Sequence, residues 1–415
     1  MAMPGYEYLI VGGGIAGQRA CEGIRQVDGQ GSIALVTQEL HLPYQRPPLS
    51  KGYLLGKEGL DKVYLKDETF YAQNGIEIMG GVQASGIDPA ARSVSLDDGR
   101  VLTYGSLLLA TGSQARRLPI PGNDLPGVFT LRTIDDANAI LAAVGKRKRA
   151  LVVGGSFIGC EVASALTQLG VGVTMVFPEA RLLELVVPVE LSTALHARYE
   201  GEGVHILPGH TPERLMGHEQ VDHAILRDKG SHLVEVDLVV MGVGVRLNTR
   251  LAGKAGLQMD EKGAVIVDET LRTSDPHIYA AGDIAAWPDA TFGKRLRVEH
   301  WDVARQQGRR AGENMAGAQK PYTALPYFYS DLFDLSFEVW GDLSAWDQTV
   351  LRGSLDSNRF VLHYFHQGRM VGVLMAGRPA EERKPLQALV KARPAYADVA
   401  DRLRDESVDL RTLVE

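Results

Sequence analysis

A chain of 415 residues is too long for one ordinary hydrophobic core, so we expect two or three domains. Hydrophobic residues make up 45% and charged residues 23%, which are globular proportions, and the net charge of −7 excludes a polyanion such as nucleic acid as an obvious partner. No apolar stretch approaches membrane-spanning length, and Met1–Gly5 is too short for a signal peptide, so we expect no membrane partner and a cytoplasmic location.

The N-terminal segment has the order of elements that binds a dinucleotide. Residues 8–11 form an apolar run without helical period, typical of a buried parallel strand, and Gly12, Gly14 and Gly17 follow at G-x-G-x-x-G spacing. The first glycine allows a tight turn, the second lets the backbone approach a pyrophosphate, and the third lets a helix pack on the strand. Glu39 follows a second apolar strand, where an acid accepts a hydrogen bond from a ribose. We therefore predict a dinucleotide site here.

The segment after this motif holds basic side chains on a stiff loop. Three prolines restrict residues 41–54, which carry Arg46 and Lys51 near whatever the first fold binds; an ordinary surface loop is the alternative. Residues 76–104 have the pattern of short strands with an Asp-Asp-Gly hairpin turn. The apolar run 107–112 predicts another buried strand, which ends in glycine.

The opening pattern returns after the short basic run 146–149, which we interpret as a solvated lead-in to a strand. The strand 150–153 leads to Gly154 and Gly159, which take the first and third places of the glycine fingerprint. Ser156 takes the second place, where its side chain crowds the approach of a pyrophosphate slightly without excluding a nucleotide.

An acid follows the second motif as well. Glu179 comes after the apolar strand 173–177, where it would accept from a ribose 2′-hydroxyl and repel a 2′-phosphate. NADH is therefore favoured over NADPH, although an arginine two residues later favours the phosphate. Two dinucleotide folds in one chain imply two nucleotides that meet at one site, and the common solution is a flavin in one fold and a nicotinamide in the other.

The cysteines and histidines point to neither disulfide nor metal chemistry. Cys21 and Cys160 are the only cysteines, no C-x-x-C spacing exists, and both fall in helices where a small packing residue is expected. Five histidines occur within residues 205–232, but their spacing is irregular. We therefore predict solvent-facing hairpin positions for them and no metal.

A third acid stands at the end of a strand in the second half of the chain. Residues 265–272 predict a buried strand, and a further strand at 278–281 ends at Gly282 and Asp283. Asp283 could accept from a sugar hydroxyl of a bound cofactor. The helix expected over residues 298–317 carries a stripe of small residues, which permits close approach either to a neighbouring helix or to a flat ring at its N-terminus.

The composition shifts toward aromatic residues after Pro321, and we expect most of them in a core. Two strand patterns flank Gln367–Gly368, which predicts a hairpin within an antiparallel sheet. Helical pieces near residues 386–390 and 399–403 complete a smaller third domain.

Through nearly its whole length the chain resembles the two-dinucleotide flavoprotein reductases. The nearest likeness is to the branch that contains bacterial oxygenase-coupled ferredoxin reductases, apoptosis-inducing factor and monodehydroascorbate reductase. The stretch PYFYSDLFDLSFEVWGD is most like the last of these, whereas Asp331 stands where the plant-type motif has arginine, as in the ferredoxin-reductase pattern. The other motifs that carry the resemblance are GGGIAG, PYQRPPLSK, LLLATGS, GGSFIGCEVA, LRTSDPHIYAAGD and VEHWDVARQQGRRAGENM.

The resemblance implies an α/β fold with two Rossmann-like dinucleotide-binding domains, one for FAD and one for NAD, and a smaller α+β C-terminal domain with an antiparallel sheet. The FAD domain would comprise residues 1–112 plus 248–316, and the NAD domain residues 113–247. The C-terminal interface domain, residues 317–415, would cover the flavin face. The implied cofactors are FAD and NAD(H).

The same resemblance implies roles for individual residues. Lys51 and Glu161 match positions that pair beside the flavin and receive the nicotinamide, and Trp301 matches a residue against the ring edge; we predict these three as catalytic. The predicted FAD contacts are Gly12, Gly14, Gly17, Glu39, Arg46, Lys51, Ala110, Thr111, Gly112, Gly282, Asp283, Glu299, His300 and Trp301. The predicted NAD contacts are Gly154, Gly155, Ser156, Phe157, Ile158, Gly159 and Glu179.

These implications describe an NADH-dependent flavoprotein reductase, an oxidoreductase that passes electrons through FAD to a one-electron acceptor. The first candidate acceptor is an iron–sulfur electron-transfer protein, a ferredoxin or rubredoxin. The alternative is a small organic radical such as monodehydroascorbate, held by Arg305 and Tyr329. A third interpretation is a redox sensor in which reduction by NADH changes dimerisation or partner binding. A homodimer stays open.

Overall fold

The computed structural model describes residues 4–145, 148–228 and 230–414, so Lys146 and Arg147 of the basic run lie outside the described residues. The chain divides into two compact units. The first comprises Met1–Gln45, Leu60–Gln114 and Arg246–Pro326, and the second Arg46–Gly59, Ala115–Val245 and Tyr327–Glu415. The predicted three-domain division stays a prediction. No helix in the described part of the chain is long and apolar enough to span a membrane.

A seven-stranded sheet forms the centre of the first unit. Its parallel strands follow the order β3, β2, β1, β6, with β18 also parallel to β6, and β5 and β4 continue it antiparallel. The last four residues of β1 are buried, as the apolar run predicts. The strands are β1 Gly5–Val11, β2 Ile33–Thr37, β3 Ile76–Gly80, β4 Ala84–Asp88, β5 Ser93–Leu96, β6 Val101–Leu109 and β18 Ile278–Ala280.

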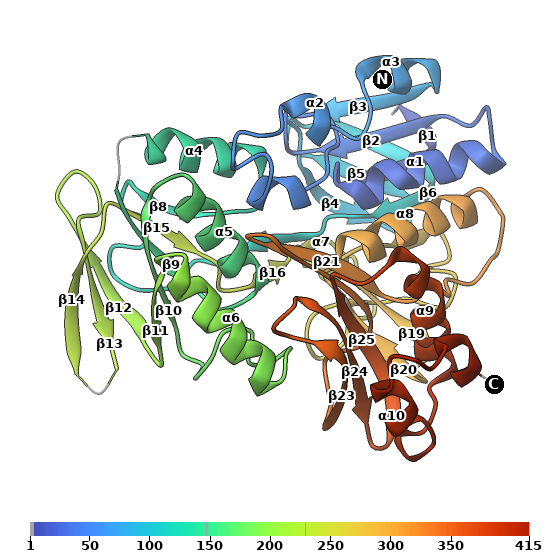
Figure 1. The fold of residues 1–415 in the computed structure, drawn as a ribbon. Coiled ribbons are helices and arrows are strands. Elements are labelled where there is room, and N and C mark those ends of the chain that lie inside the picture. Colours follow the sequence, from blue (N-terminus) through green and yellow to red (C-terminus); the bar gives the residue numbers. More distant parts are fainter. Residues whose placement is uncertain (1–3, 146–147, 229, 415) are drawn as a thin grey trace. The chain divides into compact units, whose positions relative to one another are not determined.

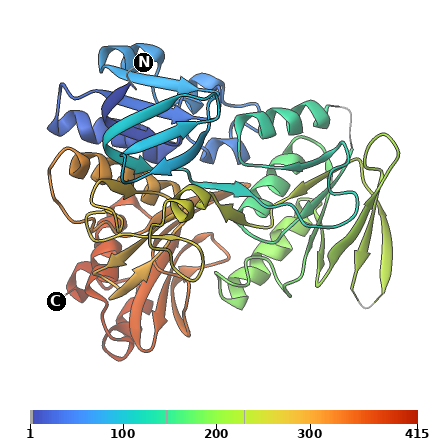
Figure 2. The same ribbon diagram turned by 180° about the vertical axis from the view of Figure 1, so that it is seen from behind.

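Two helices of the first unit lie side by side in both views of the ribbon (Figures 1 and 2). They are α1, Ile15–Val27, which contacts β1, and α8, Trp301–Met315, which contacts β6 and β18. The remaining elements of this unit are α2 Leu60–Val63, α3 Glu68–Gln73, α7 Arg250–Lys254, and a small sheet of β17 Val265–Ile266, β19 Ala285–Asp289 and β20 Lys294–Leu296. Strand β7, Ser113–Ala115, pairs with β16, Val245–Leu247.

The predicted strand over residues 265–272 is wrong beyond its first two residues. Strand β17 ends at Ile266, and the Asp268 carboxylate then closes a turn by accepting from the N–H groups of Thr270 and Arg272 at 2.8 and 3.0 Å. Leu271, inside this turn, has a φ of +67°. An aspartate whose side chain accepts from the backbone two residues further on favours a turn over strand pairing. The pattern of apolar residues does not reveal such a turn.

A five-stranded parallel sheet in the order β11, β10, β9, β15, β8 forms the centre of residues 115–245 in the second unit. Its strands are β8 Val128–Thr130, β9 Arg149–Val153, β10 Gly172–Phe177, β11 His205–Pro208 and β15 Leu238–Met241. The helices are α4 Ile134–Val144, α5 Phe157–Gln168 and α6 Val189–Gly201.

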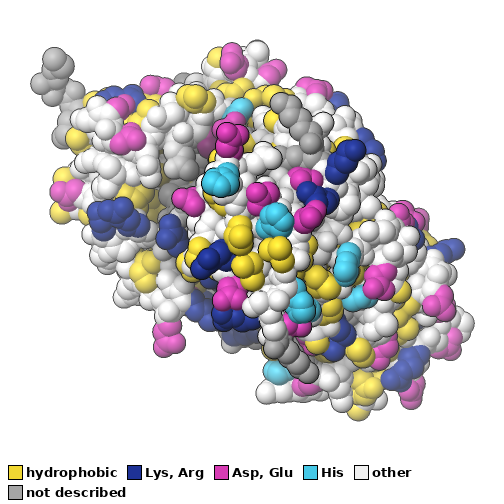
Figure 3. All heavy atoms as spheres, turned by 90° about the vertical axis from the view of Figure 1, so that its left-hand side faces the viewer, with side chains coloured by type: hydrophobic (Ala, Val, Ile, Leu, Met, Phe, Trp, Pro, Cys, Tyr) yellow, Lys and Arg dark blue, Asp and Glu magenta, His cyan; other side chains and the backbone are white. Residues whose placement is uncertain are grey.

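A separate three-stranded antiparallel sheet follows β11 along the chain. It consists of β12 Thr211–Met216, β13 His223–Arg227 and β14 Ser231–Glu235. Leu215 and Leu226 on this sheet belong to one buried cluster with Leu151 and Val239 of the parallel sheet, which anchors the small sheet by one face. Figure 3 shows histidine and acidic side chains gathered on the side of the molecule where this sheet lies.

The C-terminal segment forms a five-stranded antiparallel sheet in the order β21, β22, β25, β24, β23. The strands are β21 Tyr327–Leu332, β22 Leu335–Gly341, β23 Gln348–Ser354, β24 Arg359–His366 and β25 Arg369–Ala376, followed by α9 Arg383–Ala392 and α10 Tyr396–Arg404. Gln367 and Gly368 join β24 to β25 with φ values of +49° and +71°, so the predicted hairpin is confirmed. Short 3₁₀ helices occur at Pro47–Ser50 (η1), Ala380–Glu382 (η2) and Leu410–Leu413 (η3).

His363 makes this C-terminal sheet sensitive to acid. The side chain on β24 is 0% exposed, and its Nδ1 donates to the Val350 carbonyl at 3.2 Å. Burial lowers the pKa of His363 to about 4, and Arg352 on the neighbouring strand contributes to the shift. Since the unfolded chain takes up this proton near pH 6.5, unfolding binds an extra proton between pH 6.5 and 4, and stability falls as the pH falls through that window.

We expect His363→Gln to flatten this pH dependence. The loss of stability between pH 7 and 4 should shrink by about 3 kcal/mol relative to the unaltered chain, because the glutamine does not titrate. Urea unfolding at both pH values measures the difference. His205→Gln, at an exposed position on β11, is the matched control and should leave the pH dependence as it was. Equal slopes for His363→Gln and the unaltered chain would contradict the assignment.

Candidate functional site

The turn between β1 and α1 depends on its glycines. A Cβ on Gly12, where φ is +125°, would lie 2.1 Å from the Ala110 carbonyl oxygen, and a Cβ on Gly17 would lie 2.0 Å from the Gly12 carbonyl oxygen. Around Gly14, by contrast, a Cβ would meet nothing within 4 Å. The chain is therefore tight on the side of the sheet and open at the N-terminus of α1, which is where a pyrophosphate binds in a dinucleotide fold.

Other predicted FAD contacts of the first unit lie just after β6 and just after β2. Thr111 Oγ1 donates to the Asn248 carbonyl at 2.7 Å, and the Asn248 N–H donates to the Gly112 carbonyl at 2.9 Å. Glu39 is half-buried, and Tyr44 donates its hydroxyl to Glu39 Oε2 at 2.5 Å. Asn248 is a residue that the sequence analysis missed, because only the fold brings it beside the segment after β6.

Asp283 is a buried carboxylate at the end of β18. It is 6% exposed and accepts from Ser113 Oγ at 2.6 Å, while the Gly282 N–H donates to Gln307 Oε1 at 2.9 Å. Gly282 has a φ of +80°, which a residue with a side chain rarely adopts. The turn therefore holds Asp283 in a fixed place, supported by Ser113 and Gln307. Both lie within the quoted motifs, but neither was among the predicted site residues.

The start of α8 brings together the predicted residues 299–301. Glu299 is exposed and forms an ion pair with Arg297 at 2.6 Å, and His300 is the residue before the first turn of the helix. Trp301 is half-buried, and the Arg305 guanidinium lies 5.5 Å from the centre of its ring. The Trp301 Nε1 atom is buried and has no hydrogen-bond partner among the described residues. This donor is therefore free to bind a ligand atom.

The second unit repeats the glycine arrangement between β9 and α5. Gly154 has a φ of +122°, and a Cβ there would lie 2.3 Å from the Gly242 carbonyl oxygen. A Cβ on Gly159 would lie 2.0 Å from the Gly154 carbonyl oxygen, as in the first unit. Ser156 is exposed and donates to the Gly242 carbonyl at 3.2 Å. The Ser156 hydroxyl is thus directed toward the residue that follows β15, and serine is compatible with a turn of this shape.

The other predicted NAD residues follow the carboxyl ends of β9 and β10, which are paired parallel strands. A Cβ on Gly155 would lie 2.8 Å from the Phe177 ring, so glycine is required there. Phe157 packs edge-on against an aromatic ring of β21, with ring centroids 5.2 Å apart, and Ile158 is 44% exposed. Glu179 is half-buried and follows β10 by two residues, which is the position the ribose prediction requires.

A buried polar cluster joins three elements of the second unit. Glu161 on α5 is 3% exposed, and its Oε1 lies 2.7 Å from Lys51 Nζ. Ser330 Oγ donates to the same oxygen at 2.6 Å, and Ser50 Oγ donates to Glu161 Oε2. The Lys51 side chain is 14% exposed, and its ammonium lies 5.2 Å from the centre of the Tyr329 ring. The structure thus brings together Lys51 and Glu161, which are 110 residues apart.

Local chain geometry explains how this cluster forms. Two prolines begin the 3₁₀ helix η1, which turns Ser50 and Lys51 toward α5. On β21 the side chains alternate, so Ser330 is buried against Glu161 while Tyr329 and Asp331 lie on the other face of the strand. The sequence analysis missed the two serines, although each directly adjoins a residue that it singled out.

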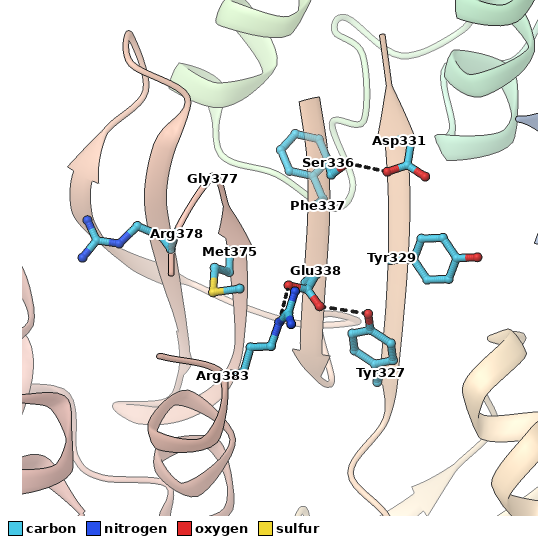
Figure 4. Close-up of a pocket in the computed structure, with 10 residues that line it drawn as sticks. All are labelled: Tyr327, Tyr329, Asp331, Ser336, Phe337, Glu338, Met375, Gly377, Arg378 and Arg383. Atoms are coloured by element: carbon cyan, nitrogen blue, oxygen red, sulfur yellow. Dashed lines mark hydrogen bonds and ion pairs between the residues drawn. The ribbon is translucent and has the colours of Figure 1, made fainter. Parts of the chain in front are cut away.

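The other face of β21 lines a cavity of about 380 Å³ (Figure 4). Arg383 Nε and Tyr327 Oη both donate to Glu338, at 2.8 and 3.1 Å. Burial and then the Asp331 carboxylate raise the pKa of Tyr329 to about 12, so its hydroxyl stays protonated at neutral pH. The residues that line the cavity are Tyr327, Tyr329, Asp331, Ser336, Phe337, Glu338, Met375, Gly377, Arg378 and Arg383.

Arg46 and Arg305 each form hydrogen bonds within their own unit. Arg46 donates its guanidinium to the Arg132 carbonyl within the second unit. Arg305 belongs to the first unit, where Asp302 accepts from it at 2.6 and 2.8 Å, whereas Tyr329 belongs to the second. The joint radical site of Arg305 and Tyr329 therefore stays a prediction, as do the catalytic roles of Lys51, Glu161 and Trp301.

Comparison with known protein families decides the assignment of the chain. Residues 6–308 match the family model described as pyridine nucleotide-disulphide oxidoreductase, and residues 327–414 match the one described as reductase C-terminal. The chain belongs to the pyridine nucleotide-disulphide oxidoreductases. Within this family, its sequence is 34% identical over 419 residues to the 5,5′-dehydrodivanillate O-demethylase ferredoxin reductase subunit of a Sphingobium species, covering 99% of each chain.

Two further relatives bear on the acceptor. The monodehydroascorbate reductase of Pisum sativum is 30% identical over 435 residues, covering 99% of each chain. The crystal structure of the covalent putidaredoxin reductase–putidaredoxin complex matches with a TM-score of 0.92 and 31% identity, covering 100% of this chain and 99% of that one. The predicted α/β fold with an antiparallel C-terminal sheet and the predicted branch of reductases are confirmed.

This pyridine nucleotide-disulphide oxidoreductase has no pair of thiols for disulfide chemistry. Members of the family use FAD and NAD(H). Its only two cysteines, Cys21 and Cys160, are both free and fully buried, and burial raises the pKa of each thiol to about 12. A buried neutral thiol is not a nucleophile at neutral pH. Neither cysteine therefore has the exposure or the thiolate character of a redox-active thiol.

Proposed function

We propose that the chain is an NADH-dependent reductase that holds FAD and delivers electrons to a small iron–sulfur protein. This acceptor is a ferredoxin or, alternatively, a rubredoxin. The observation that carries the proposal is the pair of matching glycine turns, Gly12–Gly17 and Gly154–Gly159, in one chain that lacks a reactive thiol. Two relatives that match over the full length, the Sphingobium subunit and putidaredoxin reductase, are by name reductases of ferredoxin-type proteins, which supports the same acceptor class.

The residues of the first unit fit FAD. The open space at Gly14 accommodates a pyrophosphate at the N-terminus of α1, and the half-buried Glu39 suits a ribose hydroxyl. Asp283 offers a fixed buried carboxylate, and Trp301 offers a buried N–H without a partner in the described part of the chain. Bound FAD supplies the chemistry of taking up two electrons as hydride and releasing them one at a time.

The second unit would bind NADH and orient it. The turn at Gly154–Gly159 receives the pyrophosphate, and Glu179 accepts a hydrogen bond from the ribose 2′-hydroxyl. The 2′-phosphate of NADPH would instead be repelled by the Glu179 carboxylate. The ion pair of Lys51 with Glu161 holds a fixed charge pattern in a largely buried site. The hydroxyls of Ser50 and Ser330 donate to the carboxylate and keep it in one orientation.

A small organic radical is the second candidate acceptor. It is favoured by the cavity of about 380 Å³ beside Tyr329 and by the full-length likeness to a monodehydroascorbate reductase. The cytoplasmic location, the homodimer and the absence of nucleic acid and membrane partners remain parts of the proposal.

Reoxidation of the reduced protein tests the two acceptors. The FAD-loaded protein is reduced with NADH under nitrogen, and the flavin absorbance is followed after addition of a [2Fe–2S] ferredoxin, a rubredoxin or ascorbate radical generated in situ. We expect fast reoxidation by an iron–sulfur protein, with an association rate that falls steeply as salt rises, since charge steers the encounter. Fast reoxidation by the radical alone would overturn the ferredoxin assignment, and slow reoxidation by every acceptor would favour the redox sensor.

Arg305→Ala makes the same experiment sharper. If the radical is the acceptor, the variant should raise its Michaelis constant, and if the acceptor is an iron–sulfur protein, radical kinetics should be poor in both forms. Arg309→Ala is the matched control, because it removes the same charge from the same helix at a position 52% exposed. Equal kinetics in all three proteins would count against a role for Arg305.

A further inference from the structure

A cluster of metal-ligand atoms lies on the three-stranded sheet β12–β14, apart from the turns and the polar cluster described above. His210 precedes β12, Asp228 follows β13, and His232 lies in β14. One ligand atom from each residue lies within 4.8 Å of the other two. A cluster of two imidazoles and one carboxylate is a common donor set for a divalent transition metal.

Strand register brings these residues together. Thr211 pairs with Arg227, so the residues just beyond them, His210 and Asp228, also lie beside each other. His232 pairs with Leu226 on the neighbouring strand, just past the turn that begins at Asp228. The expectation of no metal among the five histidines rested on their spacing in the sequence. That spacing does not show which of them strand pairing brings next to Asp228.

The separations between the possible ligand atoms are compatible with a metal ion. His210 Nε2 lies 3.4 Å from Asp228 Oδ2, and His232 Nε2 lies 3.0 Å from Asp228 Oδ1. Ligand atoms at about 2.0–2.1 Å from a tetrahedral Zn²⁺ are about 3.3 Å apart. Each separation is close to one edge of a zinc coordination tetrahedron. Because the two imidazoles face different oxygens of Asp228, the carboxylate must rotate to offer one oxygen to both, or ligate through both oxygens.

The tautomer of His210 is set for ligation. Its Nδ1 lies 2.9 Å from the Pro208 carbonyl oxygen, which can only accept a hydrogen bond, so Nδ1 carries the proton. The lone pair of Nε2 then points to the Asp228 side. A backbone carbonyl behind a ligating histidine is the usual second partner in metal sites, where it fixes the ring and raises the basicity of the ligand.

The turn alone explains only part of the cluster. Asp228 Oδ1 accepts from the Gly230 N–H at 2.7 Å, which accounts for an aspartate at this position. This backbone bond does not require an imidazole on each side of the carboxylate. The side chain of His210 is 17% exposed and that of His232 is 55% exposed, so solvent reaches one side and could complete the coordination.

We propose that His210, Asp228 and His232 form a binding site for a single divalent transition-metal ion of the Zn²⁺ type. With three protein ligands and water in the fourth place, the ion would clamp the beginning of β12 to the β13–β14 turn. The site has no part in the redox steps of the proposed function, so the two proposals stand or fall separately.

Zinc binding to the full-length, FAD-loaded protein tests the site. After removal of metal with a chelator, titration calorimetry with ZnCl₂ should show one saturable site in the unaltered chain. His210→Ala and His232→Ala should each weaken binding by roughly tenfold or more, since loss of even an outer partner costs about that much. Zn²⁺ should also raise the thermal unfolding temperature of the unaltered chain, with little effect on either variant.

His223→Ala is the matched control. His223 lies on the same sheet and also pairs with a carboxylate, Asp222 Oδ1 at 2.8 Å, but this pair lacks a second imidazole. Its replacement should leave zinc binding unchanged. His232 is more than half exposed, so its replacement does not threaten folding. Absence of saturable binding to the unaltered chain would overturn the proposal, and so would zinc binding by His210→Ala and His232→Ala that is as tight as in the unaltered chain.

Discussion

Replacement of Glu161 by glutamine is expected to slow the reduction of bound FAD by NADH by about tenfold to a hundredfold, because misplaced groups in a site that orders two reactants cost rates of this size. The carboxylate accepts from Lys51 and Ser330 through Oε1 and from Ser50 through Oε2. Glutamine offers a single acceptor oxygen, so it leaves the Lys51 ammonium without its counter-ion in a site that is nearly closed to water. Stopped-flow absorbance of the flavin measures the rate.

The effect should belong to the pair rather than to either residue. Lys51→Met should slow the reaction by a similar factor, and the double variant should be no slower than each single one, because both changes remove the same interaction. Lys57→Met is the matched control on the same segment, because among the described residues Lys57 donates only to Gln168, at 3.4 Å. Its rate of flavin reduction should be unchanged.

FAD content and folding separate this effect from general damage. Glu161 belongs to the second unit and the predicted FAD turn at Gly12–Gly17 to the first, so FAD should stay bound in Glu161→Gln. Ser330→Ala removes one donor while it preserves the ion pair, and a decrease of less than tenfold is expected. An unchanged rate of flavin reduction in Glu161→Gln would refute the proposed role.

Local patterns predicted those parts of the fold that neighbouring residues dictate. Gly12 and Gly154 have φ values of +125° and +122°, and each begins a turn that follows a buried strand. The spacing of the glycines was therefore enough to predict the geometry of both turns. The hairpin at Gln367–Gly368 was predictable for the same reason, since positive φ values at two adjacent residues favour such a pair. In each case the information lies within a few residues of the feature.

The parts that were missed depend on contacts between distant segments. Ser50 and Ser330 reach Glu161 across 111 and 169 residues, and a serine carries no sign of such a partner in its own neighbourhood. The cluster of His210, Asp228 and His232 depends on strand register, which sequence spacing does not show. Local sequence patterns therefore did not predict the members of the buried polar cluster. Its two charged residues, Lys51 and Glu161, were predicted only through the family resemblance.

The small-residue stripe of the helix over 298–317 left two partners open, and the structure identifies one of them. A Cβ on Gly308 of α8 would lie 2.1 Å from the Ala16 carbonyl oxygen of α1, and a Cβ on Gly312 would lie 2.1 Å from the Ala20 carbonyl oxygen. The helices are thus in contact through their backbones. Glycine on this stripe serves a neighbouring helix, and that helix begins at the predicted FAD turn.

We expect Gly308→Ala to destabilise the protein by about 3 kcal/mol and to weaken FAD retention, because overpacking costs up to about this much and the obstacle here is backbone rather than a flexible side chain. The added methyl group can be accommodated only if α8 and α1 separate, and movement of α1 displaces the turn at Gly12–Gly17. Thermal unfolding and the ratio of flavin to protein after gel filtration measure the two effects.

Gly253→Ala in α7 is the matched control for this change. The substitution is the same and lies in a helix of the same unit, but a Cβ at Gly253 meets nothing within 4 Å. Since alanine loses less backbone freedom than glycine on folding, this variant should be unchanged or more stable by up to about 1 kcal/mol. Opposite signs for the two substitutions separate the steric demand at Gly308 from the general preference of helices for alanine. If Gly308→Ala is as stable as Gly253→Ala, the helices are not in backbone contact, and the stripe needs another partner.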